Sequence, residues 1–367
     1  MRIVHLARDE KFVPLLRQLF EQALPGAHHW LIARRRGKQA FVAPAPDVVF
    51  RDEWWFRTPL IARDVAAAEV IVAHSMTTIF ANAIRRAPRA RVVWIGWGYD
   101  YYPLLESLLG DPILPETRAL IGPPRDEAPS GGAWWRPLRK PAALTAVAPR
   151  IHTFCVMPTE VELLRRALPA LRGVPHELPL FTAEDVFERG APAMDGPDIL
   201  VGNSATASNN HADAFALLQG RIGEGRLVVP LSYGNPGYGA QVADLGQRLF
   251  ADRFDALRQW MSLDAYNERI RRCGFVVMNH RRQQAVGNIG AALFKGATVY
   301  LRRENPLFDF YRGLGIELRA VDALPESAGP LQPLPPEARA RNRTLIGAHY
   351  ARERVLQAMR ELPALRG

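Results

Sequence analysis

The stretch that decides the fold is DILVGNSATASNNHADAF, residues 198–215. Its apolar run, Ile199 to Val201, is typical of a parallel strand covered on both faces, and small polar residues after Gly202 break that strand. Either Ser208 or Asn209 can cap the helix that we expect next. A strand, a turn and a helix start place N–H groups and the positive end of a helix dipole together, which suits a phosphate. The turn lacks the glycine spacing of a dinucleotide fingerprint and a P-loop lysine, so an anion site and an ordinary turn both stay open.

The composition is that of a globular protein long enough for two domains, with 367 residues, 48% of them hydrophobic and 23% charged. The formal net charge of +10 suits an anionic partner, namely a nucleotide, a nucleic acid or an acidic membrane surface, although an arginine-rich composition also arises from a GC-rich genome. No apolar window approaches the roughly 20 residues of a spanning helix, and the N-terminal apolar run is interrupted too soon for a signal peptide. We therefore expect a cytoplasmic protein. Cys155 and Cys273 each lie beside an apolar run and are expected to be buried free thiols.

Strand-like apolar runs alternate with helix-length amphipathic segments along the chain. The runs lie at 2–7, 29–33, 47–50, 69–74, 91–98 and 151–158, and then at 198–202, 226–234, 273–280, 297–301 and 315–321. This alternation predicts an α/β fold with two doubly wound parallel sheets, whose ligands lie outside the carboxyl ends of the strands. We place the first domain at 1–188 and the second at 189–335, after a linker rich in Pro and Gly. A C-terminal helix at 336–367 is expected to pack back on the first domain.

Each strand of the second domain runs into polar or small residues. Tyr233 and Gly234 follow one strand, where the tyrosine ring could stack on a base. Arg282 follows another, ahead of amides and a glycine at an expected helix start, and this chemistry suits a diphosphate. Glu304 could accept hydrogen bonds from ribose hydroxyls, and Asn305 begins a further helix. A capped turn is the alternative for each segment, but the topology brings all of them to one edge of the sheet.

The unusual segment of the first domain is RVVWIGWGYDYYPLL, residues 91–105. Asp100 comes just after an apolar strand and could act as a general base or orient a sugar hydroxyl, and Asp9 is a second candidate. For both aspartates, capping of the next helix is the alternative. Trp97 and Tyr99 lie beside Asp100, and His74 ends the apolar run at 69–74. These three residues are our candidates for contact with an acceptor. A histidine on an apolar strand is also a common core residue.

These segments together resemble a known family. ILVGNSATASNNHADAFALL, VVPLSYGNPGYGAQV, SLDAYNERIRRCGFVVMNHRRQQAVGNIGAAL, VYLRRENPLF and VVWIGWGYDYY are similar, in order and spacing, to segments of the TDP-N-acetylfucosamine:lipid II N-acetylfucosaminyltransferases, or 4-alpha-L-fucosyltransferases, of glycosyltransferase family 56. The resemblance implies a GT-B architecture, with two Rossmann-like domains facing a central cleft. It also implies transfer of 4-acetamido-4,6-dideoxygalactose from a dTDP donor to a polyprenyl-diphosphate-linked glycan at the cytoplasmic face of the inner membrane.

The resemblance places donor binding in the second domain and acceptor binding in the first. We assign the donor site to polar and small residues of the resembling segments: Asn203, Ser204, Ser208, Asn209, Tyr233, Gly234, Arg282, Gln283, Gln284, Gly287, Asn288, Glu304 and Asn305. The sequence has no zinc-spaced cysteine pair, no HExxH and no Asp-x-Asp motif, so we expect no cofactor and a reaction that is independent of metal.

Contact with a membrane surface is expected at WWRPLRK, residues 134–140. This segment pairs tryptophans with basic residues, namely Trp134, Trp135, Arg136, Arg139 and Lys140, a pattern that suits an interface with anionic lipid. A loop folded on the core is the alternative. Two other functions stay open: a nucleotide-sugar epimerase of the same two-domain shape, and a basic nucleic-acid-binding protein. The second has no helix-turn-helix, RRM-like or zinc motif to support it, so we expect no nucleic-acid partner.

Overall fold

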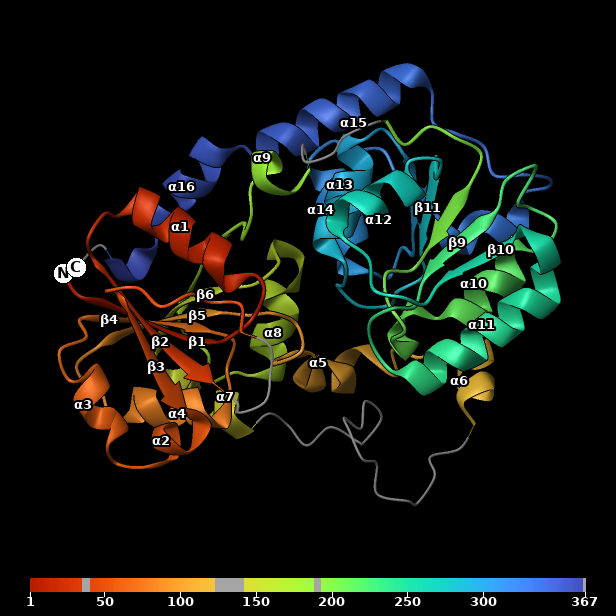
Figure 1. The fold of residues 1–367 in the computed structure, drawn as a ribbon. Coiled ribbons are helices and arrows are strands. Elements are labelled where there is room, and N and C mark those ends of the chain that lie inside the picture. The colour runs from red at the N-terminus through yellow and green to blue at the C-terminus, as the bar shows by residue number, and fades with distance from the viewer. Residues whose placement is uncertain (35–39, 123–141, 188–192, 366–367) are drawn as a thin grey trace. The chain divides into compact units, whose positions relative to one another are not determined.

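The computed structural model describes residues 1–34, 40–122, 142–187 and 193–365 (Figure 1). The chain divides into two compact units. The first comprises Met1–Gly110, Arg136–Phe181 and Arg352–Gly367, and the second comprises Asp111–Trp135 and Thr182–Ala351. Each unit is built around a parallel sheet of its own, so the prediction of an α/β fold with two doubly wound sheets is confirmed.

The sheet of the first unit has the strand order β3-β2-β1-β4-β5-β6-β7. Its strands are β1 (Ile3–Arg8), β2 (His28–Arg34), β3 (Val48–Asp52), β4 (Val70–His74), β5 (Arg91–Ile95), β6 (Ile151–Cys155) and β7 (Val174–Pro175). The chain winds outward from β1 in one direction and then outward from β4 in the other. The pair β1 and β4 is therefore the switch point of this sheet, where doubly wound folds bind ligands.

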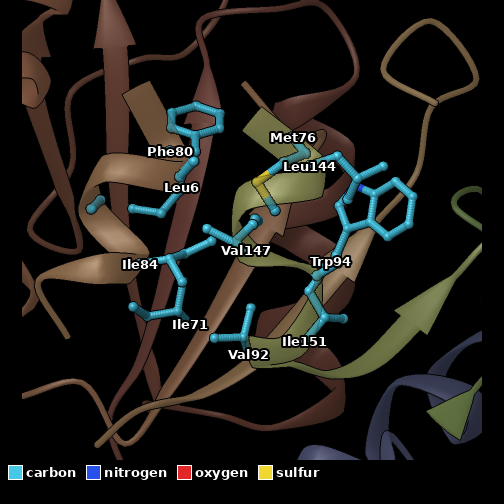
Figure 2. Close-up of a cluster of buried hydrophobic side chains, with 14 of the residues drawn as sticks. Leu6, Ile71, Met76, Phe80, Ile84, Val92, Trp94, Leu144, Val147 and Ile151 are labelled. Atoms are coloured by element: carbon cyan, nitrogen blue, oxygen red, sulfur yellow. The ribbon is translucent and has the colours of Figure 1, made fainter. Parts of the chain in front are cut away.

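Helices cover both faces of this sheet. The helices of the first unit are α1 (Val13–Ala23), α2 (Glu53–Arg57), α3 (Ile61–Val65), α4 (Thr78–Arg85), α5 (Tyr102–Leu109), α7 (Ala142–Val147), α8 (Val161–Ala167) and α16 (Arg352–Arg360). Helix α1 buries residues at spacings of three and four, and it shares one apolar cluster with α16. The opposite face packs against α4 and α7, and Figure 2 shows the side chains of these helices meeting those of the strands, among them Leu6, Ile71 and Trp94.

The sheet of the second unit repeats the same winding, with the order β10-β9-β8-β11-β12-β13. Its strands are β8 (Ile199–Val201), β9 (Leu227–Pro230), β10 (Phe254–Leu257), β11 (Phe275–Met278), β12 (Thr298–Leu301) and β13 (Arg319–Ala320). The switch point lies between β8 and β11. Residues 198–215 contain β8 and the turn after it, so they lie at the place where a doubly wound sheet binds its ligand.

The helices of the second unit lie on both faces of its sheet. They are α6 (Pro115–Ile121), α9 (Ala183–Val186), α10 (His211–Leu218), α11 (Pro236–Phe250), α12 (Leu263–Ile270), α13 (Val286–Phe294), α14 (Pro306–Gly313) and α15 (Pro336–His349). Helices α10 and α11 share one apolar cluster with the strands. Helices α9 and α15 lie against α13, and Figure 1 shows α15 passing beside both.

Several boundaries differ from those expected from the sequence. The division between the units falls at 181/182 and not at 188/189, because α9 packs on α13 and the Ala183 N–H donates to the Tyr350 carbonyl at 2.8 Å. The expected single helix at 336–367 is two helices, α15 in the second unit and α16 in the first. The runs at 91–98 and 315–321 give much shorter strands. Residues 123–141 lie outside the described residues, and α7 begins directly after them.

Both cysteines are buried free thiols, as predicted. Within the described ranges, we find no helix whose length and apolar character would let it cross a bilayer.

Candidate functional site

The turn after β8 is organised by the side chain of Asn209, which is fully buried. Its Oδ1 accepts hydrogen bonds from the Asn203 N–H at 2.9 Å and from His280 Nε2 at 2.8 Å. Its Nδ2 donates to the carbonyls of Ser204 and Thr206, both at 3.0 Å. Gly202 has a φ of +69°, and a Cβ there would lie 2.7 Å from Asn209 Oδ1. Asn209 thus holds the turn from inside, and its amide is fully engaged in doing so.

The expected helix cap at Ser208 or Asn209 is wrong. Residues Ala207–Asn209 form a 3₁₀ turn, and α10 begins two residues later with Asn210 as its N-cap in the left-handed region, at φ 53°. The Asn209 amide is used within the turn, so it is not available to the helix. Asn210 serves instead because asparagine tolerates this conformation better than most residues.

The start of α10 is covered by the segment that leads into α6. Asn210 Oδ1 accepts from the Leu114 N–H at 2.9 Å, and Asn210 Nδ2 donates to the Pro112 carbonyl at 3.0 Å. The Asp213 carboxylate accepts from the N–H groups of Glu116 and Thr117, at 3.0 and 2.9 Å. Asp213 therefore stabilises the first turn of α6 from a neighbouring helix. The sequence gives no signal for this pairing, because the partners lie almost a hundred residues apart.

The loop after β11 joins the turn after β8 through side chains. Ser208 Oγ donates to Gln284 Oε1 at 2.7 Å, and Gln284 Nε2 donates to Asn203 Oδ1 at 3.0 Å. Arg282 donates to Ser208 Oγ at 3.4 Å. These four side chains, Asn203, Ser208, Arg282 and Gln284, are named the switch-point cluster here. Each was a candidate from the sequence. The structure brings them together at the switch point, beyond the carboxyl ends of the neighbouring strands β8 and β11.

Helix α13 begins directly after this cluster. Ala285 is its N-cap with a φ of +60°, and no side chain of the described residues caps the helix. Gly287 lies in the first turn, Gln283 is half-buried in the loop before it, and Asn288 hydrogen-bonds the hydroxyl of the half-buried Tyr266. The N-terminus of α13 therefore directs the positive end of a helix dipole toward the switch point, beside the Arg282 guanidinium.

The loop after β9 lies against the turn after β8. The Ala205 N–H donates to the Tyr233 carbonyl at 2.6 Å, and the Asn235 N–H donates to the Ala205 carbonyl at 2.8 Å. Gly234 is needed at this contact, since its φ is +118° and a Cβ would lie 2.5 Å from the Ala205 oxygen. The Tyr233 side chain is 73% exposed. The backbone thus fixes the loop and leaves the aromatic ring on the surface beside it.

The loop after β12 contains two candidates with different surroundings. Glu304 accepts hydrogen bonds from Arg302 Nε at 2.6 Å and from Arg281 at 3.0 Å. Partial burial raises the pKa of Glu304, but these guanidinium hydrogen bonds outweigh it and hold the pKa below its ordinary value. Asn305 is fully buried, caps α14 through the Leu307 N–H, and donates to the carbonyls of His280 and Arg282. Its amide positions the β11 loop, and both arginines beside Glu304 were missed from the sequence.

In the first unit, Asp100 is buried and accepts three hydrogen bonds. The Met76 N–H and Trp94 Nε1 donate to its Oδ2 at 2.7 and 2.9 Å, and the Trp97 N–H donates to its Oδ1 at 2.9 Å. Burial raises the pKa of Asp100 to about 6, although the hydrogen bonds oppose the rise. Asp100 therefore ties the turn after β4 to the turn after β5, and both of its oxygens are engaged.

The other candidates of the first unit surround the ends of β1, β4 and β5. Asp9 accepts from the N–H groups of Phe41 and Val42 at 2.8 and 2.9 Å, and it pairs with Arg34. Trp97 stacks on Phe12 with a centroid distance of 3.9 Å. Tyr99 is half exposed.

His74 is buried, and one of its nitrogens hydrogen-bonds His5. The five residues expected to contact a membrane, 134–136, 139 and 140, lie outside the described residues.

Comparison with solved structures shows the fold that this chain shares with known proteins. The fold is similar to Anabaena HepE in complex with UDP-glucose, with a TM-score of 0.61 and 9% identity over 98% of this chain and 99% of that one. It is also similar to the lipopolysaccharide outer core galactosyltransferase WaaB, with a TM-score of 0.60 and 10% identity over 100% and 99% of the two chains. The trehalose-6-phosphate synthase OtsA gives a TM-score of 0.60 and 9% identity over 98% and 97%. At these identities the likeness shows the fold, which is GT-B.

A family model matches part of the sequence, most of it in the second unit. Residues 181–317 match the model of the 4-alpha-L-fucosyltransferase family, glycosyl transferase group 56. This range contains both sides of the switch point between β8 and β11 and the start of α13. The resemblance predicted from the sequence is confirmed, and the protein is a glycosyltransferase.

Proposed function

We propose that this glycosyltransferase moves N-acetylfucosamine, a 4-acetamido-4,6-dideoxy sugar, from a dTDP donor to a polyprenyl-diphosphate-linked glycan. The observation that carries the proposal is the switch-point cluster, which lies beside the uncapped start of α13 and within the range that matches the fucosyltransferase family. Donors of this kind carry a diphosphate, and the solved complex of HepE with UDP-glucose gives a precedent for a nucleotide-sugar in this fold.

The charge of the site suits the departure of a nucleoside diphosphate. As the glycosidic bond breaks, negative charge grows on the leaving diphosphate. Arg282 and the N-terminus of α13 would stabilise that charge without requiring a metal. Each well-placed hydrogen-bond donor of this kind contributes a few kcal/mol. Tyr233 would stack on the base from the β9 loop, and Glu304, held by Arg281 and Arg302, would accept from the ribose hydroxyls. Donor binding without a metal ion is part of the proposal.

We assign the acceptor to the first unit, at the ends of β1, β4 and β5. The exposed ring of Tyr99 and the stacked ring of Trp97 suit contact with a sugar. A polyprenyl acceptor would bring the protein to the cytoplasmic face of the inner membrane as a peripheral protein. The net charge of +10 supports attraction to anionic lipid, and segment 134–140 is the contact we propose.

The test is a thermal-shift titration of the purified protein with dTDP, UDP, GDP, ADP and CMP, followed by a transfer assay with dTDP-N-acetylfucosamine and a polyprenyl-diphosphate glycan. A ligand that binds only the native state raises its stability by about 2.7 kcal/mol at 100 times Kd. We expect a selective shift with dTDP that Arg282→Ala abolishes and Arg319→Ala, in the edge strand β13, preserves. Equal shifts with all five nucleotides would contradict a dTDP donor, and conversion of the donor sugar without acceptor would indicate an epimerase.

A further inference from the structure

Three buried histidines of the first unit form a continuous hydrogen-bonded chain. His28 Nε2 lies 2.9 Å from the Phe20 carbonyl oxygen, and His28 Nδ1 lies 2.8 Å from His5 Nε2. His5 Nδ1 in turn lies 3.0 Å from His74 Nε2. The three rings come from the adjacent strands β2, β1 and β4, and none is more than 4% exposed. His5 also stacks on Trp30, with ring centroids 4.0 Å apart.

The carbonyl at one end fixes where every proton in this chain lies. A carbonyl oxygen only accepts, so His28 carries its proton on Nε2 and has a lone pair on Nδ1. His5 must then donate from Nε2, and by the same reasoning His74 donates from Nε2 to His5 Nδ1. Burial lowers the pKa of all three imidazoles, so each is neutral and carries a single proton. The chain therefore ends in a lone pair on His74 Nδ1, which has no hydrogen-bond partner among the described residues.

This unpaired nitrogen lies at the switch point of the first sheet. His74 is the last residue of β4, and it lies at the carboxyl end of the neighbouring pair β1 and β4. The next residue, Ser75, has a φ of 74°, a strained value for a residue that is not glycine, and such strain is concentrated at functional sites. Asp100 holds the same turn through the Met76 N–H. Because both Asp100 oxygens are already engaged, His74 Nδ1 is the stronger candidate for proton transfer.

We propose that His5, His28 and His74 form a proton relay whose open nitrogen, His74 Nδ1, takes the proton of the attacking acceptor hydroxyl. This proposal rests on the proposed function, since it assumes a hydroxyl acceptor in the first unit. The O–H bond breaks and its proton goes to His74 Nδ1. The freed oxygen pair forms the new bond to the anomeric carbon, and the nucleoside diphosphate leaves with the electron pair of the old one.

The relay explains how a deeply buried imidazole can act as a base. When His74 Nδ1 gains a proton, its Nε2 proton moves to His5 Nδ1, and the His5 Nε2 proton moves to His28 Nδ1. The positive charge then lies on His28 and not on His74. Burial lowers the pKa of His28, but the hydrogen bond to the Phe20 carbonyl and the negative charges of Glu21 and Asp47 oppose this and favour the charged imidazolium. Asp47 is shared with Arg17. His74 Nδ1 is buried, so acceptor binding must open a path for the hydroxyl to reach it.

The first test uses nitrogen-15 spectra of the histidines in the intact protein, which report which ring nitrogen carries the proton. We expect protons on Nε2 of His5, His28 and His74. A proton on His74 Nδ1 would overturn the relay, whatever the substrate of the enzyme proves to be.

The second test is kinetic and uses His74→Gln, whose amide can still donate to His5. We expect kcat for transfer to fall by about 10²- to 10⁴-fold, with the dTDP-induced thermal shift unchanged. His28→Gln should lower kcat at least tenfold, since it leaves His74 in place but ends the relay. Trp30→Phe, which keeps an aromatic ring on His5, is the packing control and should keep kcat within threefold of wild type.

Two results would overturn the assignment: kcat of His74→Gln within threefold of wild type, or an equal loss in Trp30→Phe. Failure of the proposed function looks different. In that case the wild-type protein would transfer no sugar to the polyprenyl acceptor, while the nitrogen-15 spectra would still accept or reject the relay.

Discussion

Replacement of Asn209 by alanine tests whether the turn after β8 is held from inside. The sequence made Asn209 a candidate contact for the nucleotide-sugar, but its amide hydrogen-bonds groups of four other residues of the protein itself. Alanine would leave His280 Nε2–H and the carbonyls of Ser204 and Thr206 without these partners, in surroundings where little water can replace them.

The expected cost follows from those lost partners. A buried polar group left without a hydrogen bond costs about 1–3 kcal/mol, so we expect Asn209→Ala to lower the free energy of unfolding by about 3–5 kcal/mol. For units of this size, that corresponds to a fall in Tm of roughly 10 °C. Ser208→Ala is the matched control, because its hydroxyl lies at the edge of the same turn and bonds Gln284 and Arg282. We expect that variant to lose about 1 kcal/mol or less.

The assay is urea unfolding of wild type and both variants, read by tryptophan fluorescence, with thermal shift by dTDP measured in parallel. The reasoning is refuted if Asn209→Ala unfolds within about 1 kcal/mol of wild type and yet loses its response to dTDP. That combination would make Asn209 a direct ligand contact and not the support of the turn.

Three further predictions concern Asp100, Gly234 and Tyr233. Because burial raises the pKa of Asp100 to about 6 in the folded chain, above its unfolded value, the proton favours folding. The protonated carboxyl therefore adds about 2–3 kcal/mol to the free energy of unfolding below about pH 4, and this contribution is lost as the pH rises through 6. Unfolding curves of Asp100→Asn, measured between pH 4 and 7, should lack this pH dependence. Gly234→Ala should cost at least about 2 kcal/mol in the same assay, since its Cβ would meet the Ala205 oxygen at a φ of +118°; an unchanged midpoint would contradict the observed turn. Tyr233→Ala should leave Tm within about 2 °C of wild type but weaken dTDP binding by about 1–3 kcal/mol in a calorimetric titration, and unchanged affinity would rule out stacking on the base.

The sheets were predictable because their central strands are apolar and nearly continuous. Runs such as 69–74 and 297–301 match β4 and β12 to within a residue, since burial on both faces demands apolar side chains throughout. Edge strands carry a weaker signal. Strand β10 reads FDAL and β7 has two residues, so neither shows a pattern that distinguishes it from a loop.

The site was predictable in position but only partly in role. Polar residues after β8, β11 and β12 do meet at one edge, because parallel strands present their carboxyl ends together. Sequence patterns do not reveal which way a polar side chain faces. Asn305 and Asn209 support loops from within, whereas Ser208 and Arg282 join the switch-point cluster.

The histidine chain was also hidden from the sequence. His5, His28 and His74 are separated by tens of residues and share no motif, and each alone is an ordinary histidine on an apolar strand. Only the pairing of β1 with β2 and β4 brings the three rings to the same face of one sheet.

The path of the chain between the units limits how the protein can be divided or recombined. Unit boundaries fall at 110/111, 181/182 and 351/352 among the described residues, so no single break in the gene separates one unit from the other. A fragment that begins at Thr182 would lack α6, and the Asp213 carboxylate would lose both of its N–H donors. Exchange of the second unit with that of another GT-B enzyme must therefore carry α6 along with the contiguous segment, or replace Asp213 to match.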